Sequence, residues 1–375
     1  MNLKQLSKNL GLSQTTVSRA LNGYPEVSEA TRNRVRLAAD QFGYSPNNRA
    51  KGLATGKALA IGHVIPVSSQ HEVVNPIFAD FIAGAGEIYS RNGYEMTLCM
   101  VDDTNEENIY RGMKSRRSVD GVVVHSPRMN DTRIPLLNDI GLPFVVHGRA
   151  TGTTAPYSWL DVNNRRAFHR AAQFLLDLGH RRIGLLNGLE VMDFAFRRRS
   201  GFEDALRENG LPVDPDLMRS GEMTENFGHK HTRDMLHLHH PPTAFLASSL
   251  IVAMGARRAI EEAGLVMGRD VSIITHDDVL SYLGNGGDVP IFTATRSSVR
   301  EAGRRLAEML LAEIACPQQG TQSHLLEAEL MVGQSTGPAP TSPDPAPTFP
   351  DPAPTLPDPA PTLPDPAPTL PDPTP

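Results

Sequence analysis

Residues 3–22, LKQLSKNLGLSQTTVSRALN, predict two short helices joined by a tight turn. Gly11 permits the left-handed backbone that the turn needs, and Ser13 is suited to cap the second helix because its hydroxyl can accept an unpaired backbone N–H. Each helix has one apolar face, formed by Leu3, Leu6 and Leu10 in the first and by Val17, Ala20 and Leu21 in the second. The stretch is therefore expected to fold as a helix pair with a shared core.

The exposed face of the second predicted helix carries side chains that suit the base edges and phosphates of DNA. Its polar residues are Gln14, Thr15, Thr16, Ser18 and Arg19, and Asn22 follows at the end of the helix. An arginine such as Arg19 can donate two hydrogen bonds to one guanine, and a glutamine such as Gln14 can pair with adenine. We expect this helix to lie in the major groove of double-stranded DNA.

A third helix is predicted over residues 27–42, where apolar residues again recur at helical spacing. Ser28 is its expected N-cap. Three arginines of this helix either contact phosphates or form a solvated basic face. They are Arg32, Arg34 and Arg36. Residues 1–46 are thus predicted to form an all-α helix-turn-helix DNA-binding domain.

The charge of the chain is unevenly distributed. The 375 residues carry a formal net charge of −6, yet residues 1–57 hold nine Lys and Arg against three acids, a net of +6. A basic N-terminal module suits a polyanionic partner. Only Cys99 and Cys316 are present, so a disulfide framework is not expected. No leader-like segment and no apolar run of about 18 residues is found, so we expect a soluble cytoplasmic protein without a membrane partner.

Short apolar strands alternate with helices through the middle of the chain. Strands are expected at 60–67, 94–101, 121–125, 143–147, 182–187, 243–247 and 271–275, and helices at 76–92, 106–117, 164–178, 198–209 and 250–263. Such alternation is typical of parallel sheets with helices on both faces. The pattern restarts after Asp161, so residues 58–336 are predicted to form a two-lobed α/β domain that binds a ligand at the strand ends between the lobes.

The composition changes abruptly after Thr336. A PDPAPT motif followed by Leu or Phe repeats every seven residues from Pro343. Because proline is incompatible with a continuous helix, residues 337–375 are predicted to be a disordered tail of extended polyproline character. The tail either binds a partner or serves only as a solubilising segment.

Three segments resemble the LacI/GalR family of bacterial transcription regulators. They are TTVSRALNG at 15–23, VSEATRNRV at 27–35 and FGYSPN at 42–47, and the resemblance extends over residues 2–336. It implies that Gln14, Thr15 and Arg19 read bases, whereas Thr16 and Ser18 bind phosphates. It also implies a sensor similar to periplasmic sugar-binding proteins. In that fold the chain crosses between the lobes three times, here near 159–162, 290–293 and 323–326.

Residues 47–57, NNRAKGLATGK, are too polar and glycine-rich to form a stable helix alone. They are either a flexible linker or, as the resemblance implies, a hinge that folds into a short helix on DNA. In the second interpretation Leu53 wedges into the minor groove and kinks the duplex, while Arg49 contacts a phosphate.

The resemblance assigns three effector-binding positions to the second lobe. Arg198 lies in an R-x-x-G-F pattern, Asp277 follows the strand of IITHDD, and Ser248 in FLASSL stands where the family often has Asn. THDD replaces the usual G-Y-D-D/N pattern, which changes the expected lining beside Asp277. Two neighbouring arginines leave open that Arg198 belongs instead to a cluster of arginines on a helix surface.

The first lobe is expected to contribute polar and aromatic residues from the ends of helices and strands. These are Asn75 and Phe78 in NPIFADF, His125 and Ser126 after one strand, and His147 after the next. A histidine at a strand end is about as commonly structural as ligand-binding, and both interpretations stay open for His125 and His147. Asp161, at the first crossing, either binds the ligand or caps the following helix.

The cluster HLHH at 237–240, with His229 and His231 nearby, raises the question of a metal site. The cluster lacks Cys or carboxylate partners at ligand spacing and precedes two prolines, so an exposed loop without metal is predicted. No phosphate loop, nucleophile elbow or zinc-protease motif is found, so we expect neither a cofactor nor an enzymatic activity.

These features together predict a sequence-specific DNA-binding repressor of carbohydrate-utilisation genes that a sugar releases from its operator. The segments VVHGR, RRIGLLNG, FLASSL, THDD and TRSS resemble alpha-glucoside-type repressors of alphaproteobacteria, which suggests an alpha-glucoside as effector. Because each module reads one half-site, a homodimer on a palindromic operator is expected. Two alternatives are a transport-type sugar receptor and a sugar-processing enzyme. The basic N-terminal module opposes the first, and the lack of an activated nucleophile opposes the second.

Overall fold

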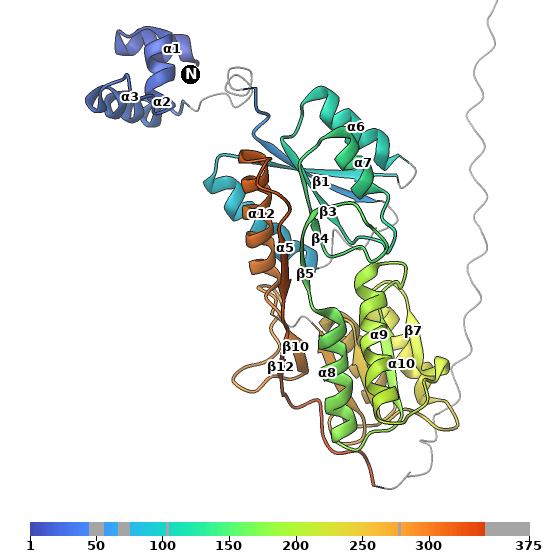
Figure 1. Cartoon of the computed structure of the whole chain (residues 1–375). Coiled ribbons are helices and arrows are strands. Elements are labelled where there is room, and N and C mark those ends of the chain that lie inside the picture. The colour runs from blue at the N-terminus through green and yellow to red at the C-terminus, as the bar shows by residue number, and fades with distance from the viewer. Residues whose placement is uncertain (45–55, 67–75, 103–104, 277–278, 342–375) are drawn as a thin grey trace, which may run out of the picture.

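The computed structural model describes residues 1–44, 56–66, 76–102, 105–276 and 279–341 (Figure 1). A small helical domain is followed by two α/β lobes, and the chain passes three times between the lobes. Most of the predicted hinge lies outside the described residues, as do Asn75, Asp277 and the chain beyond residue 341. The proposed DNA contacts Arg49 and Leu53 fall in that undescribed part of the hinge.

The helical domain contains α1 (Leu3–Leu10), α2 (Gln14–Leu21) and α3 (Glu29–Gln41). Gly11 ends α1 with φ +64°, a conformation that costs glycine no steric penalty. The Ser13 hydroxyl accepts the Thr16 N–H at 3.0 Å, and the Ser28 hydroxyl accepts the Thr31 N–H at 3.3 Å, which confirms both predicted N-caps. The shared core consists of Leu6, Leu10, Val17, Ala20, Val27, Val35 and Ala39.

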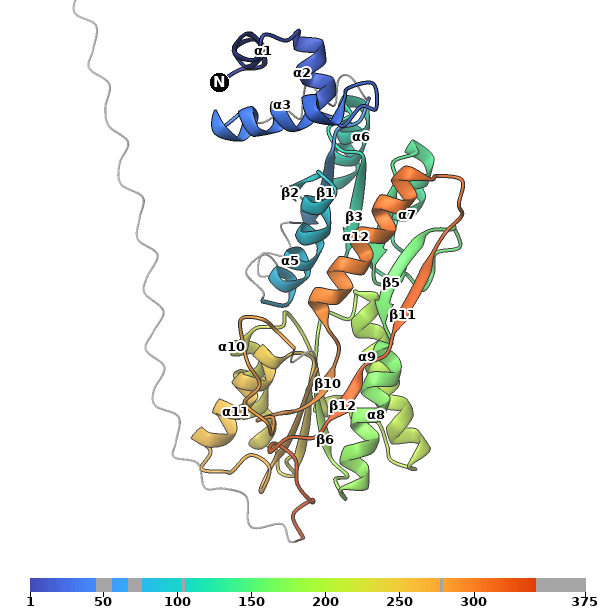
Figure 2. The ribbon, with the colours of Figure 1, turned by 90° about the vertical axis from the view of Figure 1, so that its left-hand side faces the viewer.

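The first lobe is built on a six-stranded parallel sheet. Its strand order is β11 (Ser323–Leu326), β5 (Ser158–Val162), β4 (Phe144–His147), β3 (Gly121–His125), β1 (Ala60–Pro66) and β2 (Glu95–Val101). Its helices are α5 (Pro76–Arg91), α6 (Glu106–Arg116), α7 (Arg133–Ile140) and α12 (Val299–Ala315). The adjacent helices α5 and α12 cover one face, and α6 and α7 cover the other (Figures 1 and 2). Burial on both faces explains the continuous apolar run of β3.

The second lobe repeats this plan. Its strand order is β12 (Glu329–Met331), β10 (Thr293–Arg296), β9 (Ser272–His276), β8 (Ala244–Ala247), β6 (Ile183–Asn187) and β7 (Met218–Ser220), with β12 antiparallel to β10. Its helices are α8 (Asn164–Asp177), α9 (Asp193–Glu208), α10 (Glu225–Leu236) and α11 (Leu250–Glu262). The first two helices cover one face and the last two cover the other. The predicted fold class, a helical domain followed by a two-lobed α/β domain, is confirmed.

The chain crosses between the lobes after β5, after β10 and after β11. The first and third crossings directly follow the segments predicted for them. The second crossing lies a few residues later than the predicted 290–293, because β10 comes first and the chain leaves the second lobe only after Arg296. The sequence TATR looks like a polar loop, yet Thr293 and Thr295 are fully buried. Their hydroxyls form hydrogen bonds inside the lobe, at 2.7 Å to the Thr336 hydroxyl and at 2.6 Å to His276 Nδ1.

Three helices, α7, α10 and α12, are absent from the predicted pattern, and α9 begins at Asp193 rather than at residue 198. The segment GHKHTRD obscures the apolar periodicity of α10, where His229 Nε2 lies 2.6 Å from a Glu262 oxygen of α11. Residues 237–240 follow this helix in a mostly exposed turn. Within the described residues, no three His, Cys, Asp or Glu side chains are arranged to hold a metal ion.

Glycines bring paired helices of each lobe into backbone contact. A Cβ atom added to Gly201 of α9 would lie 2.0 Å from the Arg165 carbonyl oxygen of α8. Cβ atoms added to Gly84 of α5 and Gly228 of α10 would lie 2.0 Å and 2.1 Å from backbone oxygens of α12 and α11. Any larger residue at these positions would therefore force the two helices apart.

We expect Gly201→Ala to lower the free energy of unfolding by about 1–3 kcal/mol, because the added methyl overlaps a backbone oxygen that cannot rotate away. Urea unfolding followed by circular dichroism measures this change. Ser200→Ala, one residue earlier on the same helix, is the control and should change stability by less than about 0.5 kcal/mol. Equal effects of the two substitutions would contradict the proposed role of the glycine in helix packing.

Candidate functional site

The first candidate site is the outer face of α2. Gln14, Thr15, Arg19 and Asn22 are exposed, and Thr16 and Ser18 are half-buried. The Thr16 hydroxyl lies 2.8 Å from the Ser13 hydroxyl, and Asn22 Nδ2 donates to the Ser18 carbonyl at 2.9 Å. Two of the predicted DNA contacts thus also stabilise the ends of the helix. The exposed residues form a polar surface that a groove-binding helix requires.

The arginines of α3 have different environments. Arg34 Nη2 donates to the Leu10 carbonyl at 2.8 Å, at the C-terminal end of α1, where the helix dipole favours a cation. Arg32 Nη1 donates to the Gly23 carbonyl at 3.4 Å, in the loop that follows α2. Both bonds connect the helices of the domain, whereas Arg36 is exposed. For Arg34 the structure adds a third interpretation to the two given above, in which the arginine stabilises the packing of α3 against α1.

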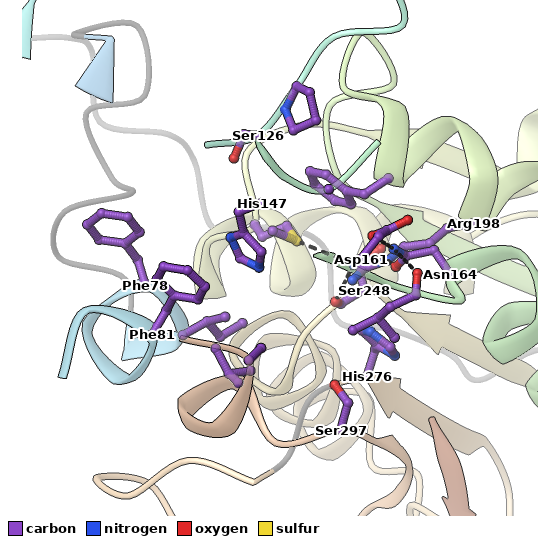
Figure 3. Close-up of a pocket in the computed structure, with 18 residues that line it drawn as sticks. Phe78, Phe81, Ser126, His147, Asp161, Asn164, Arg198, Ser248, His276 and Ser297 are labelled. Carbon is purple, nitrogen blue, oxygen red and sulfur yellow. Dashed lines mark hydrogen bonds between the residues drawn. The ribbon is translucent and has the colours of Figure 1, made fainter. Parts of the chain in front are cut away.

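The second candidate site is a cleft between the two lobes (Figure 3). Six of the predicted ligand-binding residues line it, namely Phe78, Ser126, His147, Asp161, Arg198 and Ser248. The first four belong to the first lobe and the last two to the second lobe. Most of them stand at or just after the carboxyl ends of strands, where open α/β sheets place their ligands.

Arg198 is fixed on the second-lobe wall of the cleft. The side chain is buried, its Nε donates to Asn164 Oδ1 at 2.7 Å, and its Nη1 donates to the Ser248 carbonyl at 2.9 Å. The guanidinium carbon lies 5.1 Å from the Phe168 ring centroid and 4.8 Å from that of Phe194. Hydrogen bonds and ring contacts together define one orientation of the guanidinium group.

The neighbouring arginines do not share this environment. Arg197 pairs with Asp193, and Arg199 lies 2.7 Å from both Glu190 and Glu203. Arg197 faces the first lobe, where its Nη2 also donates to the Thr151 hydroxyl at 3.0 Å. Neither Arg197 nor Arg199 is among the residues that line the cleft, whereas Arg198 lines it. The structure therefore places Arg198 outside any surface cluster of arginines.

Asp161 lines the cleft at the end of β5, but its carboxylate is already hydrogen-bonded. Arg149 Nε donates to Oδ2 at 2.8 Å, and Asn164 Nδ2 donates to Oδ1 at 3.3 Å. Burial raises the pKa of Asp161, and the bond to Arg149 opposes that shift. The suggestion that Asp161 caps the next helix is wrong, because the Asn163 side chain accepts the Arg166 N–H and caps α8.

The two predicted strand-end histidines have different positions. His147 lines the cleft and stacks on Phe81, with ring centroids 4.1 Å apart. His125 is buried behind Phe78 and Phe81, and its Nε2 lies 2.9 Å from Nδ1 of His63. The structure therefore brings His147 to the cleft between the lobes and places His125 in the core of the first lobe.

Burial keeps this histidine pair neutral. It lowers the pKa of His63 to about 3, with a smaller contribution from His147, and it lowers the pKa of His125 well below its usual range. Between the ordinary value of 6.5 and this lowered value, the unfolded chain binds a proton at His63 and the folded lobe does not. Folding stability must therefore fall as the pH decreases through this range.

We expect the free energy of unfolding to fall by about 1.4 kcal/mol per pH unit below pH 6.5 from His63 alone. Urea unfolding at pH 7.0, 6.0 and 5.0 measures the slope. His63→Leu should reduce this slope, because it removes the buried imidazole. Identical slopes in the wild type and His63→Leu would show that His63 is not kept neutral by burial.

Several lining residues are absent from the predicted set. They are Ile77, Phe81, Pro127, Gly148, Val162, Asn164, Phe194, Met223, His276, Ser297, Val299 and Ala302. Among the polar ones, the strand-end rule could have found His276, which ends β9, and Ser297, which follows β10. The apolar residues from helices carry no comparable signal in the sequence.

Two buried carboxylates connect the lobes beside the cleft. Asp193, at the start of α9, accepts the Thr151 N–H at 2.9 Å and also the Thr151 hydroxyl. Asp80 of α5 accepts the Ser281 N–H at 2.6 Å and also the Ser281 hydroxyl. Each contact joins one lobe to the other, so the separation of the cleft walls depends on both carboxylates.

Two family models match the chain. Residues 2–47 match the model described as bacterial regulatory proteins, lacI family, and residues 58–331 match periplasmic binding proteins and sugar binding domain of LacI family. The chain belongs to the LacI family. It is a DNA-binding transcriptional regulator. The exposed face of α2 and the interlobe cleft both fall within the matched segments of this LacI-family protein.

Individual relatives extend over most of the chain. The HTH-type transcriptional regulator AglR of Rhizobium meliloti is 45% identical, covering 91% of this chain and 95% of AglR. The HTH-type transcriptional regulator RafR of Escherichia coli is 32% identical over 83% of this chain and 91% of RafR. The solved Lac repressor bound to ONPG in its repressed state superposes with a TM-score of 0.73 at 25% identity, covering 90% and 99%. The solved complex of CelR with cellobiose superposes with a TM-score of 0.66 at 27% identity, and the match covers 89% of this chain and 99% of CelR.

The described helices include no candidate membrane span. None of them combines the length and the apolar character that a bilayer crossing requires.

Proposed function

We propose that this LacI-family regulator is a homodimeric repressor that a sugar, bound between its lobes, releases from a palindromic operator. The observation that carries the proposal is the buried Arg198, which is held in one orientation on the wall of a mixed polar and aromatic cleft. Because the operator is chromosomal DNA, we also propose that the protein acts in the cytoplasm. A solute receptor without a regulatory role would have no use for the basic helix-turn-helix domain.

The lining of the cleft suits a pyranose. Sugars present hydroxyl groups at the ring edge and C–H groups on the ring faces. Phe78, Phe81 and Phe194 offer apolar surface, whereas Arg198 and Ser297 carry groups of the kind that bind hydroxyls. Phe78 and Phe81 come from the first lobe and Arg198 comes from the second, so a bound sugar would contact both lobes.

We propose an α-glucoside as the effector. The motif resemblance to alpha-glucoside-type repressors supports this choice, and the 45% identity to AglR extends over 91% of the chain. The structural similarity to CelR, which was solved with cellobiose, supports a disaccharide of glucose as the size class. Asn75 and Asp277, which lie outside the described residues, remain proposed ligand contacts together with the six residues that line the cleft.

The proposed DNA-binding residues are those of α2 and of the hinge. Gln14, Thr15 and Arg19 would read base edges, and Thr16, Ser18, Asn22 and Arg49 would contact the backbone. Leu53 would insert into the minor groove. By thermodynamic linkage, a sugar that weakens operator binding must itself bind more weakly to the protein on DNA, by the same factor.

Exposed apolar side chains support a homodimer. Leu98 and Met100 on β2 are 48% and 49% exposed, Met254 on α11 is 41% exposed, and Tyr282 is 87% exposed. The elements β2 and α11 lie along the same side of the two lobes (Figure 2). A surface of this kind on both lobes suits a second copy related by twofold symmetry.

We expect Tyr282→Asp to weaken dimerisation by at least about tenfold, because a charge would replace an aromatic ring in the proposed interface. Analytical ultracentrifugation at several protein concentrations measures the change. Val191→Asp is the control, because Val191 is 56% exposed in the loop that precedes α9 and lies outside the proposed interface. The interface assignment is wrong if both variants dissociate equally.

Binding to the promoter region of the neighbouring genes tests the whole proposal. Fluorescence anisotropy would be measured with labelled DNA and with sucrose, maltose, trehalose, cellobiose or raffinose as effector. We expect tight, salt-sensitive binding that an α-glucoside reverses. Binding that a sugar strengthens would reverse the proposed switch, and a lack of specific binding under every condition would contradict the repressor function.

A further inference from the structure

Four polar side chains form a hydrogen-bonded chain from the first lobe to the second, which we call the crossing relay. Arg149 Nε donates to Asp161 Oδ2 at 2.8 Å, Asn164 Nδ2 donates to Asp161 Oδ1 at 3.3 Å, and Arg198 Nε donates to Asn164 Oδ1 at 2.7 Å. Arg149 and Asp161 belong to the first lobe, and Asn164 and Arg198 to the second. Asp161, Asn164 and Arg198 are 5%, 3% and 6% exposed. The three side chains lie next to one another at the cleft (Figure 3).

The chemistry of its neighbours determines the orientation of the Asn164 amide. Its NH₂ group faces two acceptors, the Asp161 carboxylate and the Val162 carbonyl at 3.0 Å. Its oxygen faces the Arg198 guanidinium, which can only donate. A flipped amide would set N–H groups against the arginine and an oxygen against the carboxylate, so one orientation is strongly preferred.

We propose that Asn164 is a positioning residue, which sets the orientation of Arg198 for the sugar and ties it through Asp161 to the first lobe. The proposal rests on the function proposed above. Asn164 was not among the site residues predicted from sequence motifs. Its proposed role depends on two hydrogen bonds, one donated to Asp161 of the first lobe and one accepted from Arg198 of the second. The half-buried Asn163 beside it bonds instead to Glu327 and caps α8.

Asn164→Asp separates the two halves of this role. The new carboxylate keeps an acceptor for Arg198 but loses both N–H donors and sets an oxygen against Asp161. Two carboxyl groups at this separation share one proton until the pH is high enough to remove it. When the proton is present it restores a donor to the relay, and when it is lost the two charges repel each other and displace Arg198.

Other charged and titratable groups near this point are present in every variant. Asp161 faces Arg149, Asp193 and Arg197, while His147 and His276 line the same cleft. Asn138→Asp is therefore the matched control. It adds the same charge at an exposed site of the first lobe that does not line the cleft, where the Asn138 amide donates to the Pro156 carbonyl at 3.0 Å and not to a carboxylate. The ratio of the two variants removes the titration of the shared groups.

Isothermal titration calorimetry with sucrose, maltose and trehalose would be carried out on the full chain at pH 5, 6, 7 and 8. Relative to Asn138→Asp, we expect the affinity of Asn164→Asp for the binding sugar to fall about tenfold from pH 5 to pH 8. Its melting temperature without sugar should fall over the same range. Asn164→Leu should bind weakly at every pH, because it loses both ends of the link.

The crossing relay would be overturned if the affinity of Asn164→Asp relative to the control variant, or the difference between their melting temperatures, did not change with pH. If none of the three sugars binds the wild type, the proposed effector is wrong, and the melting series alone then decides whether the relay exists. A purely structural asparagine would lower affinity and stability by the same amount at each pH.

Discussion

A protein with Arg198→Met is expected to stay on its operator when the sugar is added. Methionine fills much of the same volume between Phe168 and Phe194 but cannot donate hydrogen bonds. Each bond to a charged group contributes about 1.5–3 kcal/mol, so the affinity for sugar should fall on the order of 100-fold. Operator affinity should change little, because the cleft lies in the two-lobed domain and α2 lies in another domain. Calorimetry with the sugar and anisotropy with operator DNA measure the two affinities separately.

Arg199→Met is the matched control for this experiment. It removes the same guanidinium from the next position of α9, where the arginine forms ion pairs with Glu190 and Glu203 and does not line the cleft. Sugar binding should stay within about twofold of the wild type, since partly exposed ion pairs contribute little. If Arg199→Met loses the sugar as completely as Arg198→Met, general damage to α9 explains both results and the assigned role of Arg198 is wrong.

Arg19→Ala is expected to produce the opposite phenotype, with normal sugar binding and loss of operator recognition. An arginine paired with one guanine contributes about 1–3 kcal/mol of discrimination, so operator affinity should fall roughly 10- to 100-fold. The affinity for random DNA should fall much less. Anisotropy with operator, single-base variants and random duplexes measures the loss, and specificity should relax at one base pair of each half-site.

Arg36→Ala distinguishes base reading from phosphate contact. Arg36 is exposed on α3 and lies outside the predicted reading face. If it contacts a phosphate, its removal should weaken all duplexes similarly and reduce the slope of log affinity against log salt by about one. An Arg19→Ala protein that binds random DNA as poorly as Arg36→Ala does would show that Arg19 contacts the backbone and not a base.

The fold was largely predictable because its strands are covered on both faces. The uninterrupted apolar runs of β3 and β6 and the helix lengths between strands indicate parallel sheets without further information. β10 is the exception, because its buried threonines make their hydrogen bonds to residues distant in sequence. A strand whose polar side chains form hydrogen bonds only with residues distant in sequence looks like a loop. For this reason β10 was not predicted, and the second crossing was placed a few residues too early.

The candidate site was predictable where a ligand group follows a strand or matches a family motif. Arg198, Ser248 and His147 are of this kind. His125 is also at the end of a strand, yet it lies in the core. A side chain at a strand end can point either into the cleft or into the core, and the local sequence does not distinguish these two orientations. Asp193 was not predicted for a related reason, because its partner Thr151 lies in the other lobe.

The glycine contacts between paired helices restrict how such a protein can diversify. Where two backbones touch, as at Gly201, no side chain can change size without separating the helices. The lining of the cleft, by contrast, comes mostly from residues at element ends that are not trapped between backbones. New sugar specificities in descendants of this gene should therefore arise by substitution at the rim of the cleft, while the interior of each lobe is inherited almost unchanged.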